Sequence, residues 1–228
     1  MVKFTYQNNT YDGLIEVVEQ NKDIIFNSET DTAPLTFILK NIFTTTNFRS
    51  NSSFIWIDDN GNEIKGSTAG GWSNSPFYSD IQNITFIDAF EGDRTDLLNE
   101  SIKSVKKKTD FGPARTNAAA REYYPAKILS ERIWTPSASE LGVLPPTNTA
   151  PEAQQGDTYI WFTNNDSRIK KYFETPERYW TRTWEGTTAF RIYGVGFDGG
   201  YAYDISTTTP ALGIMAFETA GLIFGFCI

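Results

Sequence analysis

The chain has no histidine and a single cysteine in 228 residues. Histidine is the most common general base and metal ligand in proteins, so its absence excludes Ser-His and Cys-His nucleophile pairs. The one thiol, Cys227, cannot form an intrachain disulfide, and it lies in an apolar tail where we expect it to be buried and inert. A chain without disulfides fits assembly in a reducing cytosol.

Long hydrophobic runs and an excess of positive charge are also missing. No apolar run reaches the roughly 20 residues that span a bilayer, and Met1 to Tyr6 lack the pattern of a signal peptide. The formal net charge of −8 disfavours binding to a nucleic-acid backbone. We expect the one cluster of cations, Lys103 to Lys108, to be the solvated end of a helix. The sequence therefore predicts neither nucleic acid nor membrane as a partner.

Aromatic residues, in contrast, are abundant, with 17 Phe, 11 Tyr and 6 Trp. Large rings bury much area per residue, so a core can form although only 39% of the chain is hydrophobic. The most regular aromatic pattern runs from Arg178 to Trp184. At a period of two, its faces hold Tyr179, Thr181 and Thr183 on one side and Arg178, Trp180, Arg182 and Trp184 on the other. The second face either packs cations over rings or presents a flat surface to a ligand.

Most of the chain is predicted to form short strands separated by Gly, Asn, Asp and Pro turns. The expected strands are residues 3–10, 14–19, 23–27, 53–58, 63–65, 127–134, 157–162, 178–184, 188–195, 201–206, 213–218 and 220–228. The first two are joined by a turn at Tyr11 to Gly13. Residues 34–43 and 83–90 fit either strand or helix. We expect the apolar tail to pair into a sheet or to pack in a subunit interface.

Three short helices are predicted. The first covers Asp93 to Val105, with an apolar stripe and an early carboxylate. The second begins at Ser137, whose capping-box partner is Glu140 three residues later. The third is a short basic helix over residues 168–173.

Two kinds of residue are candidates for ligand contact. Rings can stack on sugar faces while polar groups at the rim donate hydrogen bonds, although packing in the core accounts for about half of such rings. The loop from Gly196 to Gly200 is a further candidate, because loops on a rigid sheet often carry function. The predicted ligand-binding residues are Arg182, Trp184, Tyr193, Phe197, Asp198, Tyr201 and Tyr203.

Catalytic and metal sites have weaker signals. A calcium site is conceivable from Asn164, Asp166, Asp198 and Asp204, but turn roles explain these four equally well. The candidate carboxylate pairs for glycoside hydrolysis are Glu174 with Glu177 and Asp88 with Glu91. Because 28 acidic residues make such pairs inevitable, the prediction is no catalytic residue, no metal and no cofactor.

Three landmarks in order resemble the DUF6273 family. They are Gly70-Gly71-Trp72 with Ser75, the Lys-rich stretch from Leu98 to Thr109, and the region from Ile133 to Leu212. The last opens with Ile133-Trp134-Thr135-Pro136-Ser137, contains Tyr179-Trp180-Thr181-Arg182-Thr183 and closes with Pro210-Ala211-Leu212. The match covers roughly residues 54 to 218. Two departures are Trp184 in place of a family proline and Thr209 in place of an arginine.

The resemblance implies an α+β, C-type-lectin-like mixed fold with twisted antiparallel sheets and two or three short helices. It is the fold of sulfatase-modifying proteins and of phage receptor-binding proteins, and in it Trp180 is expected to be buried. The oxidase members use reactive cysteines, which Cys227 alone does not match. Residues 1–50 are outside the match and are expected to be a β-rich attachment segment, with the lectin-like domain at 51–228.

The resulting hypothesis is a bacteriophage virion protein of the tail, collar or head fibre, assembled in the bacterial cytoplasm. Under this hypothesis the protein is a homo-oligomer without enzymatic activity, and it binds host surface glycan or a neighbouring virion protein. One alternative is a purely structural capsid or tail decoration protein without ligand binding. The other is an enzyme that degrades cell-wall polymer.

Overall fold

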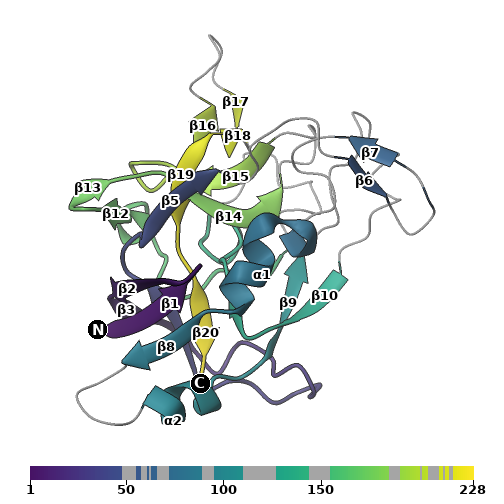
Figure 1. Cartoon of the computed structure of the whole chain (residues 1–228), viewed down its shortest axis with the longest axis vertical. Helices are drawn as coiled ribbons and strands as arrows, with labels where there is room; N and C mark the ends of the chain where they lie inside the picture. The colour runs from purple at the N-terminus through teal and green to yellow at the C-terminus, as the bar shows by residue number, and fades with distance from the viewer. Residues whose placement is uncertain are drawn as a thin grey trace.

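A computed structural model describes most of the chain (Figure 1). The described residues are 1–47, 55–57, 61, 63–65, 72–88, 95–109, 127–143, 155–184, 191–200, 202–204, 211–212, 214–215 and 218–228. This part of the chain is rich in strands, arranged in several mostly antiparallel sheets, and contains two short α-helices. The prediction of a mixed fold that is rich in antiparallel sheets is therefore confirmed.

The chain begins with a hairpin of β1 (Val2–Tyr6) and β2 (Asn9–Gly13), and β8 (Thr85–Asp88) pairs with the other edge of β1. Its two-residue turn is Gln7-Asn8, where φ is +47° and +63°. Positive φ at both central residues gives the turn a twist that matches the right-handed twist of the two strands. The predicted turn at Tyr11 to Gly13 is therefore wrong, because these residues belong to β2.

A four-stranded sheet has the order β11-β20-β4-β3. It comprises β3 (Ile15–Gln20), β4 (Leu35–Leu39), β11 (Ile133–Trp134) and β20 (Gly225–Cys227). Residues 34–43, which fitted strand or helix by sequence, thus supply a strand. The apolar tail is an inner strand of this sheet, so the prediction that it pairs is confirmed.

A five-stranded sheet has the order β18-β15-β14-β19-β5. It contains β5 (Thr44–Asn47), β14 (Tyr179–Trp184), β15 (Arg191–Val195), β18 (Ile214–Met215) and β19 (Thr219–Leu222). The predicted strand at 178–184 is its centre, and Trp180 is buried with its indole N–H donated to the Thr46 carbonyl at 2.9 Å.

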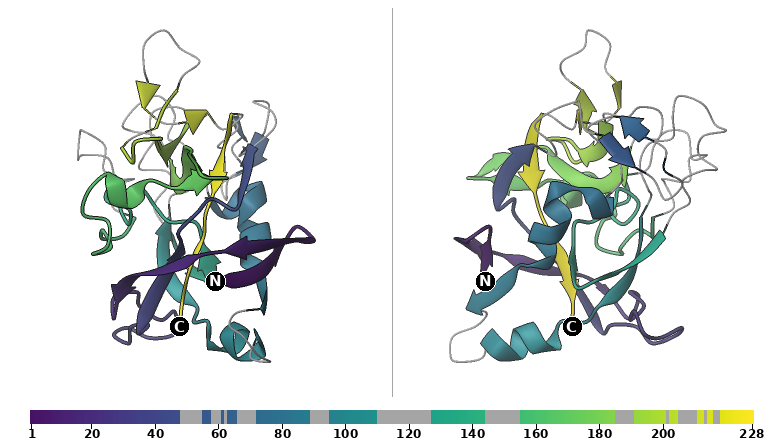
Figure 2. Two further views of the ribbon diagram at one scale, coloured as in Figure 1. Left: turned by 90° about the vertical axis from the view of Figure 1, so that its left-hand side faces the viewer. Right: turned by 45° about the vertical axis from the view of Figure 1, so that its right-hand side comes forward.

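The N-terminal residues share these sheets with the C-terminal ones. β4 pairs with β20, and β5 pairs with β19. Figures 1 and 2 show the last residues, in yellow, running through the middle of the molecule from the five-stranded sheet to the four-stranded one. Residues 1–47 are therefore built into the same sheets as the end of the chain.

The helices are shorter than predicted. α1 (Pro76–Gln82) is capped by Ser75, whose hydroxyl accepts from the Tyr78 N–H, and follows the 3₁₀ turn η1 (Trp72–Asn74). α2 (Thr95–Ser101) ends four residues before the predicted Val105. Beyond it Lys103 bridges to Cys227, and the lysine run becomes β9 (Val105–Thr109), which pairs with β10 (Lys127–Glu131).

Two further predictions are wrong. Residues 157–162 form turns rather than a strand. Residues 168–173 do not form a helix, because the 3₁₀ turn η4 (Asp166–Arg168) leads into a small hairpin of β12 (Lys171–Tyr172) and β13 (Thr175–Pro176). Backbone hydrogen bonds from Ile42 to Lys171 and from Glu177 to Lys170 hold this segment extended.

The remaining strands are short. β6 (Ile55–Ile57) and β7 (Glu63–Lys65) form the predicted hairpin, and β16 (Tyr203–Asp204) pairs with β17 (Ala211–Leu212). None of the described helices is long and apolar enough to cross a bilayer.

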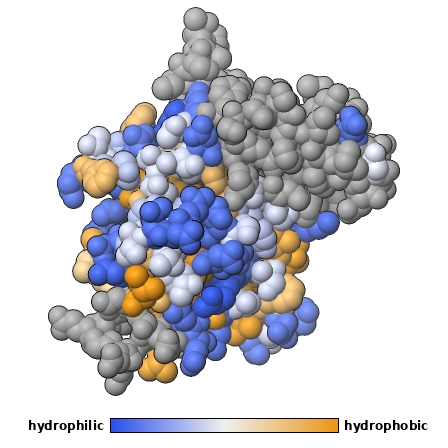
Figure 3. Space-filling view, viewed as in Figure 1, coloured by the Kyte–Doolittle hydropathy of each residue, from blue (hydrophilic) through white to orange (hydrophobic). Residues whose placement is uncertain are grey.

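The core is largely aromatic. Phe4 packs edge-on against Phe43 and Phe224 at 5.2 and 4.9 Å, and Phe226 contacts Phe86 at 5.0 Å. These rings join the N-terminal hairpin to the C-terminal tail, so the two ends of the chain are packed together. The face shown in Figure 3 is mainly hydrophilic over its described part, with scattered apolar groups.

Candidate functional site

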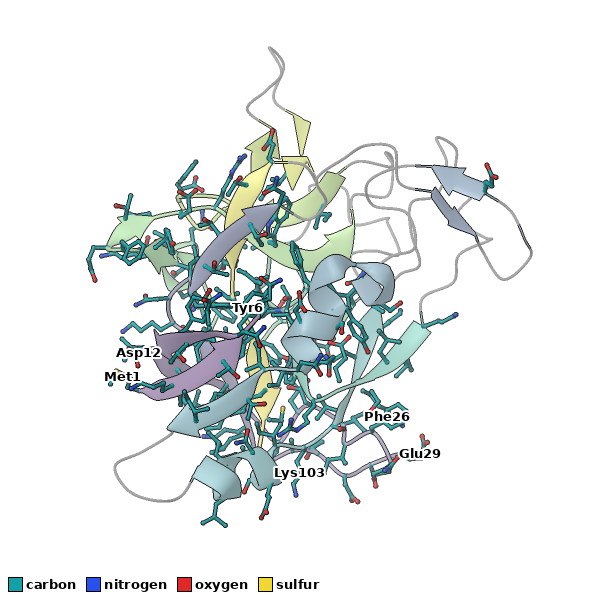
Figure 4. The ribbon with its side chains drawn as sticks, viewed as in Figure 1. Met1, Tyr6, Asp12, Phe26, Glu29 and Lys103 are labelled. Carbon is teal, nitrogen blue, oxygen red and sulfur yellow. The ribbon has the colours of Figure 1, made fainter. Side chains whose placement is uncertain are left out.

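The lysine run places one ammonium group in the interior. In β9 the side chains of Val105, Lys107 and Thr109 all point inward, as a strand period of two requires. Lys107 is 2% exposed, whereas Lys103, labelled in Figure 4, lies at the surface. The predicted solvated helix end is therefore wrong, and its central cation is buried.

Lys107 is held by three oxygen atoms and an indole ring. Its Nζ donates to Asp23 Oδ1 at 2.5 Å, to the Tyr159 hydroxyl at 2.6 Å and to Glu140 Oε1 at 2.9 Å. The Trp134 ring centroid lies 3.9 Å away, which is a close cation–π contact. Such partners are needed, because an isolated buried ammonium group has a large desolvation cost.

Arg182, a predicted ligand-binding residue, belongs to the same cluster. Its Nη1 and Nη2 donate to Glu140 Oε2 at 2.6 Å and Oε1 at 2.9 Å, and its remaining bonds reach the carbonyls of Lys108, Thr135 and Gln155. Arg182 is fully buried, so it does not line a binding surface. Burial alone would raise the pKa of Glu140, but Arg182 and Lys107 lower it to about 2.

The predicted capping box at Ser137 fixes Glu140 in this position. The Ser137 N–H donates to Glu140 Oε2 at 2.9 Å, and the Glu140 N–H donates to the Ser137 hydroxyl at 3.1 Å. Both reciprocal bonds of the motif are present, although the segment forms turns and not a helix. The capping motif thus positions an acid for two buried cations.

Two weaker acids lie next to the cluster. Burial raises the pKa of Glu131 to about 7, against the lowering effect of Arg182 and Lys107, and its Oε1 accepts the Trp72 indole N–H at 3.0 Å. Burial also raises the pKa of the Cys227 thiol, which lies 3.3 Å from the Thr36 hydroxyl and is fully buried. The thiol is therefore inaccessible and inert, as the sequence predicted.

The structure separates the other predicted ligand residues. Phe197 is 51% exposed and Asp198 is exposed, both on the predicted loop after β15. Trp184, Tyr193 and Tyr203 lie on β14, β15 and β16, and the structure does not describe their side chains. Tyr201 lies outside the described residues. The described part of the predicted surface is thus the loop itself.

This loop is held in one position by glycine. Gly199 has φ of +75°, and a Cβ there would lie 1.9 Å from the Asn165 carbonyl oxygen, so the loop backbone packs directly on the segment that precedes η4. The Gly196 N–H donates to the Gly200 carbonyl, and the Gly200 N–H donates to Asp198 Oδ1 at 3.0 Å. Phe197 is therefore presented to solvent from a fixed turn.

The sequence reasoning missed Phe173, which is 82% exposed at the tip of the β12–β13 hairpin. Phe173 and Glu174 have φ of +46° and +68°, the geometry of a two-residue turn that favours Asn and Gly. A bulky residue there is strained by about 1–2 kcal/mol. The hairpin projects at the left of Figure 1. A Pro and a cluster of charges around Phe173 were the only signals in the sequence.

The metal and carboxylate candidates have structural roles where they are described. Asn164 Oδ1 accepts the Ser167 N–H at 3.0 Å, and Asp198 accepts from Gly200. Within the described ranges, no group of three or more Cys, Asp or Glu side chains is placed to hold a metal ion. Glu174 is exposed beside Lys171, and Glu177 accepts the Arg178 N–H. The side chains of Asp88, Glu91 and Asp204 are not among those that the structure describes.

No family model, curated protein or solved structure matches this chain.

Proposed function

We propose that the protein is a bacteriophage virion component that recognises host surface glycan and does not catalyse a reaction. A C-type-lectin-like scaffold, from the resemblance of its motifs to the DUF6273 family, would carry the recognition surface. Other virion proteins are its assembly partners, and the particle holds it as a homo-oligomer. The observation that carries the recognition role is the exposed Phe173 in a strained turn.

Phe173 adopts a strained backbone conformation, and its side chain contributes little to the packing of the core. Its ring contacts Tyr172 at 4.4 Å but remains 82% exposed, so it adds little to the core. Asn or Gly in the same turn would remove the strain. Residues that the surrounding structure holds in a strained backbone conformation cluster at functional sites. An exposed ring that the fold does not need is therefore assigned to a ligand.

Two other segments supply further exposed rings. Trp161 is about half exposed on the segment that leads to η4, and Phe197 stands on the loop packed against that segment. Flat rings stack on the apolar faces of sugars, and polar groups such as Asp198 are available beside them. We define the candidate recognition surface as Trp161, Phe173, Phe197 and Asp198.

The test uses Phe173→Asn with Glu174→Asn as its matched control. Both substitutions relieve positive φ in the same turn, so each should stabilise the protein by up to about 1 kcal/mol in urea unfolding. Only Phe173→Asn removes a ring, and it should lower binding to purified host cell walls at least tenfold. Phe197→Ala should lower it as well.

Three outcomes separate the alternatives. Equal binding by Phe173→Asn and Glu174→Asn would contradict the proposed surface. Loss of incorporation into particles with wall binding unchanged would assign Phe173 to a neighbouring virion protein. Release of soluble wall fragments by the wild-type chain would contradict a purely binding role.

A further inference from the structure

Lys107 and Asp23 form a buried amine–carboxyl contact between segments that are far apart in sequence. Nζ lies 2.5 Å from Oδ1, and 84 positions separate the two residues. Lys107 is 2% exposed and Asp23 is 9% exposed. The pair is thus held together in a site that excludes most water, where condensation is not opposed by bulk hydrolysis.

The other oxygen of Asp23 is surrounded by hydroxyl donors. Oδ2 accepts from the Thr36 hydroxyl at 2.6 Å and lies 3.1 Å from the Tyr159 hydroxyl. Donors that already point at a carboxyl oxygen can stabilise the negative charge that develops when its carbon is attacked. Thr36 and Tyr159 are therefore placed as an oxyanion hole for Asp23.

A third carboxyl group can move protons between the two reactants. Glu140 Oε1 accepts from Lys107 Nζ at 2.9 Å, and the Tyr159 hydroxyl lies 3.2 Å from both Glu140 Oε1 and Asp23 Oδ1. A continuous path therefore runs from the amine through Glu140 and Tyr159 to the oxygen that must leave.

We propose that Lys107 and Asp23 condense into an intramolecular amide that cross-links β9 to the segment between β3 and β4. In this reaction Nζ attacks Cγ of Asp23, the oxyanion at Oδ2 is held by Thr36 and Tyr159, and the bond from Cγ to Oδ1 breaks. Two of the three ammonium protons leave with Oδ1 as water, and the third stays on the amide nitrogen. The overall change is ammonium plus carboxylate to amide plus water, so no oxidant or activating group is needed.

The charge balance of the cluster favours this product. Before condensation it holds the cations of Lys107 and Arg182 and the carboxylates of Asp23 and Glu140. The amide removes one charge of each sign and leaves the bidentate pair of Arg182 with Glu140. A neutral amide avoids the desolvation cost that a buried ion pair must offset. Asp23 is the electrophile, because Arg182 binds both oxygens of Glu140, whereas the oxygens of Asp23 face Lys107, Thr36 and Tyr159.

The reaction is expected to be slow and to follow folding. Burial lowers the pKa of Lys107, but the carboxylates of Asp23 and Glu140 outweigh it, so that its pKa is raised. The amine must therefore pass a proton to Glu140 before it can attack, and the low pKa of Glu140 makes this transfer unfavourable and rate-limiting. Since the acceptor is fixed at hydrogen-bond distance, this step requires the folded cluster and is absent in the unfolded chain.

Intact-mass spectrometry of the full chain, purified and incubated after folding, tests the amide. The expected mass is lower than that of the sequence by one water, and tandem spectra should join the peptides that contain Asp23 and Lys107. Under denaturing electrophoresis the closed loop should also migrate faster. A chain that keeps its full sequence mass after prolonged incubation would overturn the proposal.

Two variants separate the amide from other losses of water. Asp23→Asn should condense with release of ammonia, so its final mass should equal that of the cross-linked wild type although the sequences differ. Lys107→Arg keeps the cation but cannot form this amide, and it should retain its sequence mass. Loss of water in Lys107→Arg would contradict the assignment to Lys107.

The role of Glu140 has its own readout. Glu140→Gln keeps the shape of the side chain but cannot carry the proton, so cross-linking should slow at least tenfold in protein that folds by circular dichroism. A folded Glu140→Gln chain that cross-links at the wild-type rate would contradict Glu140 as the proton carrier.

Discussion

Arg182 is the residue on which the buried cluster depends most directly. Its guanidinium makes two bonds to Glu140 and three to backbone carbonyls, with no exposure to solvent. Arg182→Ala should lower the free energy of unfolding by about 3–5 kcal/mol, because it leaves Glu140 buried without its main cation. Urea denaturation measures this loss. Lys106→Ala, which removes a pair with the 94% exposed Glu29, should change stability by less than about 1 kcal/mol.

Glu131 gives the cluster a pH dependence with a defined sign. Burial raises the pKa of Glu131 to about 7, so between pH 4.5 and 7 the folded state binds more protons than the unfolded state. Stability therefore falls as pH rises through this window, by at most about 3 kcal/mol, and the loss is complete above pH 7. Glu131→Gln should be more stable than wild type at pH 8 and nearly equal to it at pH 4.5. Equal stability of the two proteins at pH 8 would contradict the raised pKa.

Among the elements, β20 is the strand that joins β11 to the rest of the four-stranded sheet. It lies between β11 and β4, and its Phe226 stacks on Phe37 at 5.2 Å. Deletion of residues 225–228 would leave both neighbours without their ladder bonds and would open the aromatic core. The truncated chain should show no cooperative thermal transition by circular dichroism. Ile228→Ala, at the half-buried end of the chain, should retain the transition with a loss of about 1 kcal/mol.

Elements with a strict local pattern were predictable from the sequence. The alternation at 178–184 gave a strand, the Ser137 and Glu140 pair gave a capping box, and the apolar tail gave an inner strand. The lysine run gave the wrong element, because its helical flank ended at Ser101 and its charges suggested solvent. Its period of two, with Val105, Lys107 and Thr109 on one face, was the signal for a strand.

Residues from distant segments could not be brought together by the sequence alone. Asp23 lies between β3 and β4, Lys107 lies on β9 and Glu140 lies in the capping motif, and no spacing between these residues encodes their meeting. The same holds for Phe173, whose exposure and positive φ depend on a hairpin that the basic composition of 168–173 concealed. Local propensity was overridden there by backbone pairing with distant segments, including the bond from Ile42 to Lys171.

For the whole molecule, the net charge constrains the kind of host polymer that the recognition surface can bind. At −8 the protein repels anionic wall polymers, and this repulsion is weak beyond about 10 Å in 0.1 M salt. Stacking of Phe173 and Phe197 on neutral sugar faces does not depend on ionic strength in this way. Binding to host walls should therefore be unchanged or stronger when salt is raised, and removal of anionic polymer from the walls should not weaken it. Sedimentation of the protein with intact and stripped walls at low and high salt measures both effects. A steep loss of binding with added salt would show that cationic side chains of the protein carry the interaction. That result would contradict the proposed surface of exposed rings.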